Sequence, residues 1–359
     1  MQLCIFEDRQ FSNFLPLVFF RPVYALRCGA TKLRDKIERL FPQADVVYHS
    51  RPELTEYLRE VHPKRMINDL KEEPTWFING RVLADENFQR LVRIPPKRDT
   101  VYLKEGDVVA AFVGRDFIRS KEKRFSTEMI SKEMFESLSG EEIEMTLLKY
   151  PWELVHRNGE ELCRDFAFAT KKSKGKKIFG KVYPGSHLLH KTDILLGKGT
   201  VVKPGAVLDA EAGPIMVGDN VTIFPNAVIE GPAYVGHSSL IKVGAKIYGN
   251  TSIGEVCKVG GEVEASIIHS YSNKQHDGFL GHSYLGSWIN IGADTNNSDL
   301  KNNYGTVEVS VQGERVDSGL QFVGLYMGDH SKTGINVMFD TGTVIGVSCN
   351  VYGAGLPPK

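Results

Sequence analysis

The chain has no excess of charge and no closely spaced cysteines. Lysine plus arginine and aspartate plus glutamate each number 44, so the formal net charge is zero. A neutral chain offers no electrostatic reason to bind nucleic acid or an anionic membrane as its main partner. The cysteines form no CxxC pair and lie far apart, at Cys4, Cys28, Cys163, Cys257 and Cys349. This pattern favours reduced thiols in a cytoplasmic protein over disulfides or a zinc site.

Long hydrophobic runs are also missing. No apolar stretch reaches the roughly 18–20 residues that a membrane-spanning helix needs. Residues 1–8 (MQLCIFED) lack the basic region and long apolar segment of a signal peptide, so we expect a β-strand there. With 359 residues, 42% of them hydrophobic, the chain is expected to form two globular domains without a membrane partner.

The first part of the chain mixes strand and helix patterns. Residues 31–41 have helical spacing at Leu33, Ile37 and Leu40, and the segment stops before a proline. Strands that alternate with helices predict an α/β layer fold, which we assign to residues 1–150. The segments that carry this prediction are expected strands at 2–6, 45–49, 75–78 and 108–113, and expected helices at 31–41, 52–61 and 127–139.

Residues 151–176 are predicted to link this domain to a second one at residues 177–359. The segment ends in the basic stretch 171–177 (KKSKGKK). A run of like charges is usually solvated, and a binding patch is the alternative interpretation.

The second half carries a six-residue repeat. A period of six matches neither an α-helix, at 3.6, nor a simple strand, at 2. Three such hexads close one triangular coil, with the aliphatic residue inward and glycine or asparagine at the turn. The pattern predicts a left-handed parallel β-helix. The aliphatic positions are Val217, Ile223, Ile229, Val235, Ile241, Ile247, Ile253 and Val259.

The repeat is interrupted before it resumes at Met327. Between about residues 293 and 325 the sequence is a polar insertion, which includes NNSDLKNNYG at 296–305. Loops that leave a solenoid usually line its binding face. We therefore expect the active site in the gap between Val259 and Met327.

One motif lies in this gap. A histidine, His276, is followed by Leu280-Gly281 and then by Asn-Ile-Gly-Ala at 290–293. At these offsets the motif resembles the acetyltransferase half of the GlmU-type bifunctional sugar-1-phosphate nucleotidylyltransferase/N-acetyltransferases. The resemblance implies that His276 is the catalytic base, that Asn290 contacts the sugar phosphate, and that the backbone N–H of Ala293 meets the acetyl thioester. Histidine suits proton removal near neutrality, and a fixed N–H stabilises an oxyanion.

This half holds three further candidate residues. His282 is the neighbouring candidate for the base, and Lys274 is a candidate contact to a phosphate. Lys332 is a candidate for binding acetyl-CoA, because residues 328–336 resemble the coil after the insertion in archaeal members. The family's tyrosine and lysine are replaced here by Phe279 and Glu264.

The first domain resembles the nucleotidylyltransferase half only in part. It lacks the Gly-rich loop that cradles the triphosphate, since residues 6–10 read FEDRQ. The segment around Leu15–Pro16–Leu17 and Arg21 resembles the Leu-Pro-Leu…Pro-Lys element that the family carries after this loop. For Arg21 the resemblance implies a phosphate contact, and a structural ion pair is the alternative. Asn79 and Gly80 fall where the family has a sugar-nucleotide loop, and a simple turn is the alternative. Uridylyl transfer would also need Mg²⁺, for which the available carboxylates are Asp8, Asp69 and Asp85.

The resemblance implies an enzyme of two coupled activities. It would acetylate an amino-sugar 1-phosphate with acetyl-CoA and join the sugar 1-phosphate to a nucleoside triphosphate, as in UDP-N-acetylglucosamine synthesis. The family works as a homotrimer, so we expect one here. Two alternatives stay open: a nucleotidylyltransferase whose β-helix only trimerises it, and a non-catalytic scaffold that binds sugar nucleotides.

Overall fold

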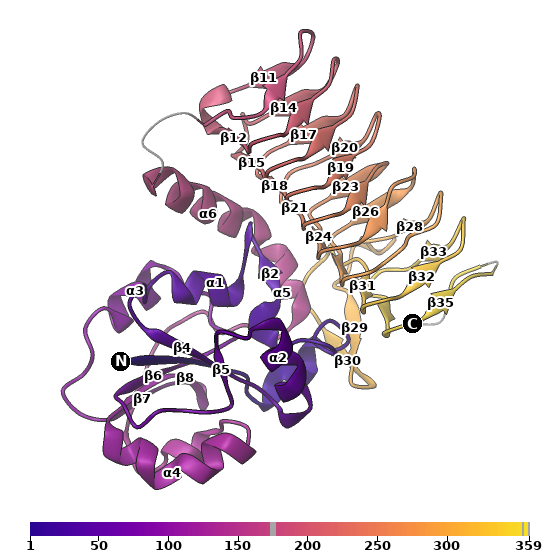
Figure 1. The fold of residues 1–359 in the computed structure, drawn as a ribbon. Helices are drawn as coiled ribbons and strands as arrows, with labels where there is room; N and C mark the ends of the chain where they lie inside the picture. Colours follow the sequence, from indigo (N-terminus) through magenta and orange to yellow (C-terminus); the bar gives the residue numbers. More distant parts are fainter. Residues whose placement is uncertain (173–176, 354, 358–359) are drawn as a thin grey trace. The chain divides into compact units, whose positions relative to one another are not determined.

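The computed structural model describes residues 1–172, 177–353 and 355–357 (Figure 1). Most of the basic stretch at 171–177 therefore lies outside the described residues. The chain forms two compact units. Unit 1 consists of Met1–Phe14, Phe20–Leu26 and Lys32–Lys149, and unit 2 of Leu15–Phe19, Arg27–Thr31 and Tyr150–Lys359. Among the described residues, none of the helices is long and apolar enough to cross a membrane.

Unit 1 is built on a seven-stranded sheet in the order β5-β4-β1-β6-β8-β7-β9. The strands β5, β4, β1 and β6 are parallel, whereas β8 runs antiparallel to both β6 and β7. The strand bounds are β1 Gln2–Phe6, β4 Asp45–His49, β5 Met66–Ile67, β6 Thr75–Asn79, β7 Thr100–Lys104, β8 Asp107–Val113 and β9 Ser139–Glu142. The helix bounds are α1 Leu33–Glu38, α2 Thr55–Val61, α3 Glu86–Val92 and α4 Arg115–Thr127, with short 3₁₀ turns η1 Arg9–Phe14, η2 Val23–Ala25, η3 Pro52–Leu54 and η4 Lys132–Phe135. The predicted α/β fold is confirmed.

Both faces of this sheet are buried. Along β1, Leu3 and Ile5 enter one hydrophobic cluster, while Cys4 and Phe6 enter another on the opposite face. A strand buried on both faces reads as a continuous apolar run, which is why β1 was recognisable. The helix expected at 127–139 is wrong: the helix is α4, at Arg115–Thr127, and only the short η4 lies in the expected segment. The many charged residues of α4 hid the narrow apolar face formed by Phe117, Ile118 and Phe125.

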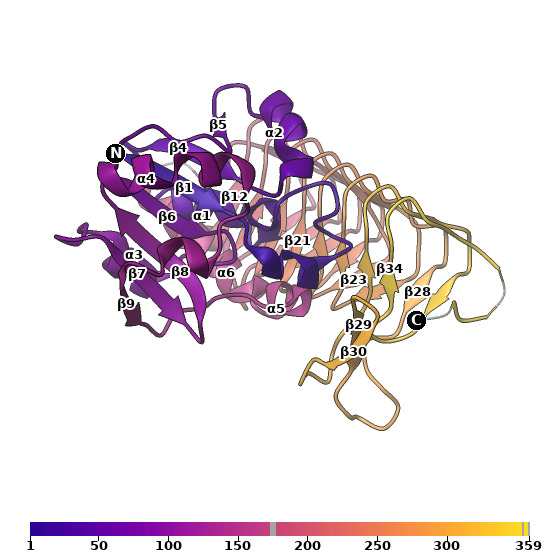
Figure 2. The same ribbon diagram turned by 90° about the horizontal axis from the view of Figure 1, so that it is seen from below.

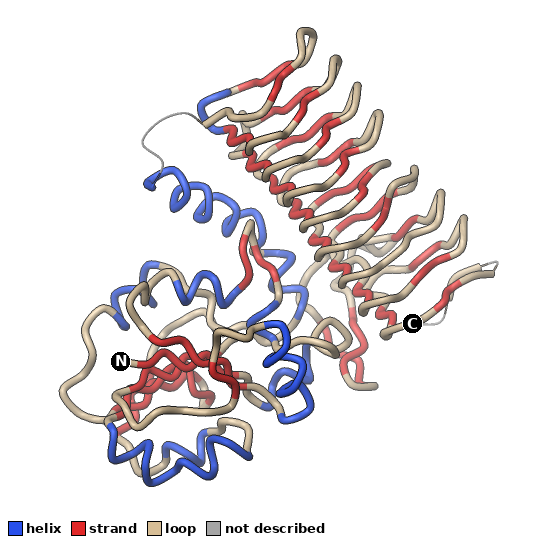
Figure 3. Tube along the Cα trace, viewed as in Figure 1, coloured by secondary structure: helices blue, strands red, loops and turns tan. Residues whose placement is uncertain are grey.

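Unit 2 is dominated by a left-handed parallel β-helix with three faces (Figures 1 and 3). We call them face 1, face 2 and face 3, so that each coil from β12 onward runs from face 1 to face 2 to face 3. Face 1 holds β12 Ile194–Leu196, β15 Ile215–Val217, β18 Ala233–Val235, β21 Thr251–Ile253, β24 Ile267–Ile268, β27 Tyr284–Leu285, β31 Tyr326–Met327 and β34 Val344–Ile345. Face 2 holds β10 Lys181–Val182, β13 Val201–Val202, β16 Thr222–Ile223, β19 Leu240–Ile241, β22 Lys258–Val259 and β25 Asn273–Lys274, and the later pair β32 Lys332–Thr333 and β35 Asn350–Val351 continues it.

Face 3 completes each coil. It holds β11 His187–Leu189, β14 Val207–Asp209, β17 Val228–Glu230, β20 Lys246–Ile247, β23 Glu262–Glu264 and β26 Phe279–Gly281, followed by the pair β28 Asn296–Asn297 and β33 Met338–Phe339. The eight aliphatic residues predicted to point inward are all buried in one core. Because each strand pairs with the coils before and after it, the backbone groups are satisfied by stacking.

The insertion predicted between residues 293 and 325 leaves the β-helix after β28 and returns at β31. It contains an antiparallel hairpin of β29 Glu308–Val311 and β30 Glu314–Asp317. Figure 2 shows this hairpin projecting away from the stacked coils.

Most of the predicted linker at 151–176 is helical. Residues up to 172 form α5 Pro151–His156 and α6 Asn158–Lys172, which belong to unit 2 and bury Trp152, Leu154 and Leu162. Within this unit they meet the short β2 Arg27–Cys28, part of a hairpin with β3 Thr31–Lys32. The side chain of Ser252 on face 1 donates to the carbonyl of Gly29 (2.9 Å) and contacts Oδ1 of Asn158 (3.0 Å). The outer surface of face 1 is thus covered by segments from elsewhere in the chain.

Candidate functional site

His276 lies on the turn between β25 and β26, at the corner where face 2 meets face 3. Its side chain is exposed to solvent. The next coil presents Ala293 and Asp294 at the same corner, and the backbone N–H of Asp294 donates to the carbonyl of Asp277 (3.0 Å). Coils in such a helix are spaced by about 4.8 Å. The structure therefore brings His276 and Ala293, which are 17 residues apart in the sequence, to the same corner of adjacent coils.

Lys274 points into the core of the β-helix. It takes the inward position that Val259 and Ile241 hold in the two preceding coils, and its side chain is only 2% exposed. Its ammonium group donates to the carbonyls of Gly260 (3.1 Å), His276 (3.1 Å) and Gly278 (2.6 Å). Burial lowers the pKa of Lys274 to about 8, against the raising influence of nearby carboxylates. The predicted phosphate contact of Lys274 is therefore corrected: its amine holds the turn that carries His276.

Asn290 lies on the outer surface of face 2, where polar residues stack from coil to coil. It is exposed and is bridged directly to Asn273 on one side and Lys332 on the other. Lys332 donates to the backbone carbonyls of His330 (2.6 Å) and Trp288 (3.3 Å), and its side chain stays exposed. We call this row the polar stripe; its members are Lys258, Asn273, Asn290, Lys332 and Asn350.

Sequence reasoning missed Lys258 and Asn273 as members of this row. The available signal was their position one residue before an inward residue of face 2, Val259 and Lys274 respectively. In a β-strand, neighbouring side chains point to opposite faces, so that position must point outward.

His282 lies at a different corner, where face 3 turns into face 1. Its Nδ1 is 2.8 Å from Oδ2 of Asp299, and its ring stacks on Phe322 with the centroids 5.1 Å apart. Asp299 and Phe322 both belong to the insertion, so this cluster ties the insertion to the coil below it. His282 is not on the corner that carries Ala293. No sequence signal pointed to Asp299.

In unit 1, two carboxylates follow β1 at the carboxyl end of the parallel strands. Glu7 is buried, contacts the guanidinium of Arg51 (2.7 Å) and accepts from the backbone N–H of Val23 (3.0 Å). Burial raises the pKa of Glu7 to about 7, although Arg51 opposes this shift. Asp8 is held by the guanidinium of Arg81, with a shortest contact of 2.6 Å. These ion pairs occupy the place where the resemblance calls for a Gly-rich phosphate loop.

Asn79 and Gly80 are fixed in a turn at the same end of the sheet. The amide of Asn79 donates to Asp8 (2.7 Å) and to the carbonyl of Val108 (2.8 Å). The N–H of Gly80 donates to the carbonyl of Phe6 (2.7 Å), and a Cβ at this position would lie 2.8 Å from the side chain of Tyr24. The turn interpretation is therefore favoured for this pair. Arg21 is 9% exposed, so it offers little surface to a phosphate.

The carboxylates predicted for Mg²⁺ do not converge. Asp8 is engaged by Arg81, Asp85 caps α3 by accepting from the N–H of Phe88 (2.9 Å), and Asp69 is exposed. Across the described parts of the chain, no group of three or more His, Cys, Asp or Glu side chains is placed to hold a metal ion. Asp8, Asp69 and Asp85 therefore do not form one shared Mg²⁺ site, and the use of Mg²⁺ stays a prediction.

Comparison with known proteins finds a family similarity in the N-terminal part of the chain. Residues 3–174 match the model of a family described as sugar nucleotidyl transferase. The similarity to GlmU-type proteins expected from the motif is also confirmed, because the chain matches several of them at moderate identity.

Three such relatives illustrate the similarity. The bifunctional protein GlmU of Rippkaea orientalis is 31% identical over 162 residues, which are 44% of this chain and 30% of the relative. A bifunctional sugar-1-phosphate nucleotidylyltransferase/acetyltransferase of Sulfurisphaera tokodaii is 35% identical over 104 residues, 28% of this chain and 26% of the relative. The bifunctional protein GlmU of Methanocaldococcus jannaschii is 35% identical over 100 residues, 28% and 23% respectively. The matches thus span less than a third of each of these relatives.

Proposed function

We propose that unit 2 is an acetyl-CoA-dependent N-acetyltransferase acting on an amino-sugar 1-phosphate. The observation that carries the proposal is the placement of His276 and Ala293 at one corner of adjacent coils, beside the polar stripe. The printed names of the relatives, which include acetyltransferase activity, support the same reaction class.

The chemistry needs a base and an oxyanion donor. The imidazole of His276 takes a proton from the amino group as the nitrogen attacks the thioester carbonyl. The tetrahedral oxyanion that forms is stabilised by the backbone N–H of Ala293. Collapse then breaks the carbon–sulfur bond, and the thiolate of CoA leaves and takes up the proton from the imidazolium. No covalent enzyme intermediate is required.

The buried lysine gives this site its rigidity. Lys274 binds the carbonyls of His276 and Gly278, so the backbone on both sides of the turn is held from inside the coil. An acyl-transfer site works best when base and donor are fixed before the reaction, because no free energy is then spent on ordering them.

The polar stripe supplies the recognition. Lys258 and Lys332 present cations on the outer surface of face 2, and Asn290 between them presents an amide. Phosphate oxygens accept hydrogen bonds from such groups. We assign the sugar phosphate to Asn290, and the phosphates of acetyl-CoA to Lys332.

A second candidate function is nucleotidyl transfer by unit 1, coupled to the acetylation. The family match of residues 3–174 favours it. The carboxyl end of β1 argues against it, because Glu7 and Asp8 stand where a triphosphate would need backbone N–H groups. We therefore propose that unit 1 binds the sugar nucleotide without transferring it.

The assembly and location are part of the same proposal. His276 and the polar stripe are exposed in the single chain, so a neighbouring copy is needed to enclose acetyl-CoA, and we propose a homotrimer. Sedimentation equilibrium measures this directly. The cysteines are all free, in keeping with reduced thiols, and the cytoplasmic location inferred from them stays a prediction.

A thiol-release assay with acetyl-CoA and glucosamine 1-phosphate tests the function. We expect His276→Ala to lower the rate by about 10²–10⁴-fold, the usual contribution of a general base. His237→Ala, on another corner and also exposed, serves as the matched control. Equal CoA release by wild type and His276→Ala would show that His276 is not the base, and loss of activity only in His282→Ala would move the role there.

Pyrophosphate release from UTP or dTTP with a sugar 1-phosphate tests unit 1 separately. We expect no pyrophosphate with or without Mg²⁺. Release of pyrophosphate would restore nucleotidyl transfer, and binding without either activity would favour a scaffold.

A further inference from the structure

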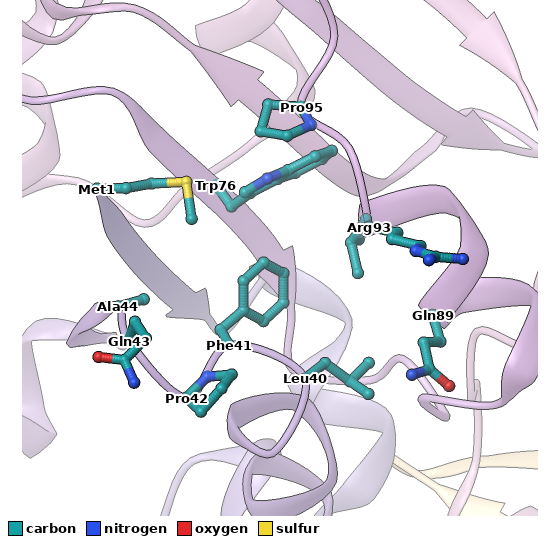
Figure 4. A pocket seen from close by; sticks show the side chains of 11 residues that line it. Met1, Leu40, Phe41, Pro42, Gln43, Ala44, Trp76, Gln89, Arg93 and Pro95 are labelled. Carbon is teal, nitrogen blue, oxygen red and sulfur yellow. The ribbon is translucent and has the colours of Figure 1, made fainter.

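Unit 1 contains a hollow of about 340 Å³ at the amino ends of its parallel strands. It opens between the loop that follows α1, the start of β6 and the end of α3. Figure 4 shows the ring of Phe41 and the indole of Trp76 at its centre, with Leu40 below and Pro95 above. This volume falls at the lower end of the range of small-molecule sites.

The hollow is remote from the end of the sheet considered above. β1 and β6 are parallel, and Trp76 lies near the start of β6 whereas Asn79 ends it. At about 3.3 Å per residue the two ends of these strands are roughly 13 Å apart. Sugar nucleotides in α/β folds bind at the carboxyl ends, so a ligand in this hollow would not compete with them.

The floor of the hollow is apolar. Trp76 is fully buried, Phe41 and Val92 nearly so, and Ala44 closes one side. Solvent in contact with such a floor is released when an apolar group covers it, which favours binding. At the roughly 30 Å³ that a water molecule occupies in the liquid, the space admits about ten non-hydrogen atoms.

The rim of the hollow has one sign of charge. Arg93 follows the last turn of α3 and is exposed, and within the described chain no carboxylate forms an ion pair with it. Gln43 and Gln89 add two amides, and none of the residues that line the hollow is acidic. In Figure 4, Arg93 and Gln89 lie on the same side of the hollow. This rim complements a carboxylate and disfavours an amine.

We propose that this hollow binds a small apolar carboxylate, such as a medium-chain aliphatic acid. The apolar body covers Trp76 and Phe41, and the carboxylate pairs with Arg93. The site lies in unit 1 and is independent of the acetyl transfer proposed for unit 2.

Calorimetric titration of the full chain with octanoate tests the proposal, with octylamine as a probe of the same length and opposite charge. We expect one octanoate per chain with a Kd below about 1 mM and no measurable heat with octylamine. Arg93→Glu is expected to weaken octanoate binding about tenfold, whereas Arg90→Glu, on the same helix but outside the hollow, leaves it unchanged.

Ala44→Phe fills the hollow and should abolish binding, with circular dichroism confirming that the variant is folded. The proposal is overturned if octanoate fails to bind, if octylamine binds equally well, or if Arg93→Glu and Arg90→Glu behave alike. None of these outcomes bears on CoA release by unit 2.

Discussion

Replacing the buried Lys274 by methionine separates the stability of the β-helix from the order of the turn that carries His276. The change keeps the length of the side chain and removes the ammonium group. Two opposing effects on the free energy of unfolding follow. The carbonyls of Gly260 and His276 lose their donor, at a cost of about 1–3 kcal/mol for each one that stays buried without another partner, whereas the carbonyl of Gly278 still accepts from the N–H of Glu262 (3.2 Å).

The opposing effect is the loss of a buried charge. The pKa of Lys274 falls from 10.5 to about 8 on folding, which corresponds to about 3 kcal/mol at 1.36 kcal/mol per pKa unit. Because the two effects are of similar size, we expect Lys274→Met to change stability at pH 7 by less than about 2 kcal/mol. The turn, however, loses its internal anchor, so CoA release should fall at least about tenfold.

The pH dependence gives the sharper test. Between pH 8 and 10.5 the unfolded chain holds a proton on Lys274 that the folded chain has lost, so this residue makes stability rise with pH by up to about 3 kcal/mol. Urea unfolding of wild type and Lys274→Met at pH 7, 8, 9 and 10 measures the difference. Lys246→Met, an exposed lysine on face 3, is the matched control. If Lys274→Met and wild type keep the same slope between pH 8 and 10, Lys274 does not lie in the interior as described.

Two further predictions concern buried charges elsewhere. Arg27 pairs with Glu255 (2.6 Å), and its side chain is almost fully buried. Arg27→Met should therefore destabilise unit 2 by about 3–5 kcal/mol in thermal unfolding, and adding Glu255→Gln should recover part of this loss. An unchanged Tm in the single variant contradicts the prediction. Burial lowers the pKa of His49 from 6.5 to about 4, so the unfolded chain binds the extra proton between these values and stability falls as pH drops from 6.5 to 4. In urea unfolding, His49→Gln should reduce this loss of stability between pH 6.5 and 4 by up to about 3 kcal/mol. An equally large loss of stability in the variant would refute the burial of a neutral His49.

The hexad pattern predicted the β-helix because its cause is local. An inward position recurs every six residues wherever three equal strands close a coil, so Val217 to Val259 could be identified from the sequence alone. The same reasoning predicted the site region, since the motif from His276 to Ala293 begins where the count breaks. The hexad count did not identify Lys274 as an inward residue. Val259 follows Ile241 on the same face by 18 residues, whereas Lys274 follows Val259 by only 15. Because this coil is three residues shorter, counting in sixes no longer shows which of its residues point inward.

Other features depended on contacts between distant segments. The helices α5 and α6 were not predicted from the sequence. Their apolar sides pack on the outer surface of face 1, and this surface exists only after the β-helix has formed. The ion pairs of Glu7 with Arg51 and Asp8 with Arg81 join residues 44 and 73 positions apart. No local signal distinguishes such carboxylates from free ones that could bind a metal.

By itself, the sequence determined the two fold classes, the aliphatic core of the β-helix and the motif that carries His276. Only the tertiary structure decided which lysine faces the core, which carboxylates are already paired, and which corner His276 and Ala293 share. The physical reason is the range of the interactions. Strand period and coil length act between near neighbours, whereas burial, ion pairing and the meeting of adjacent coils exist only once the chain has folded.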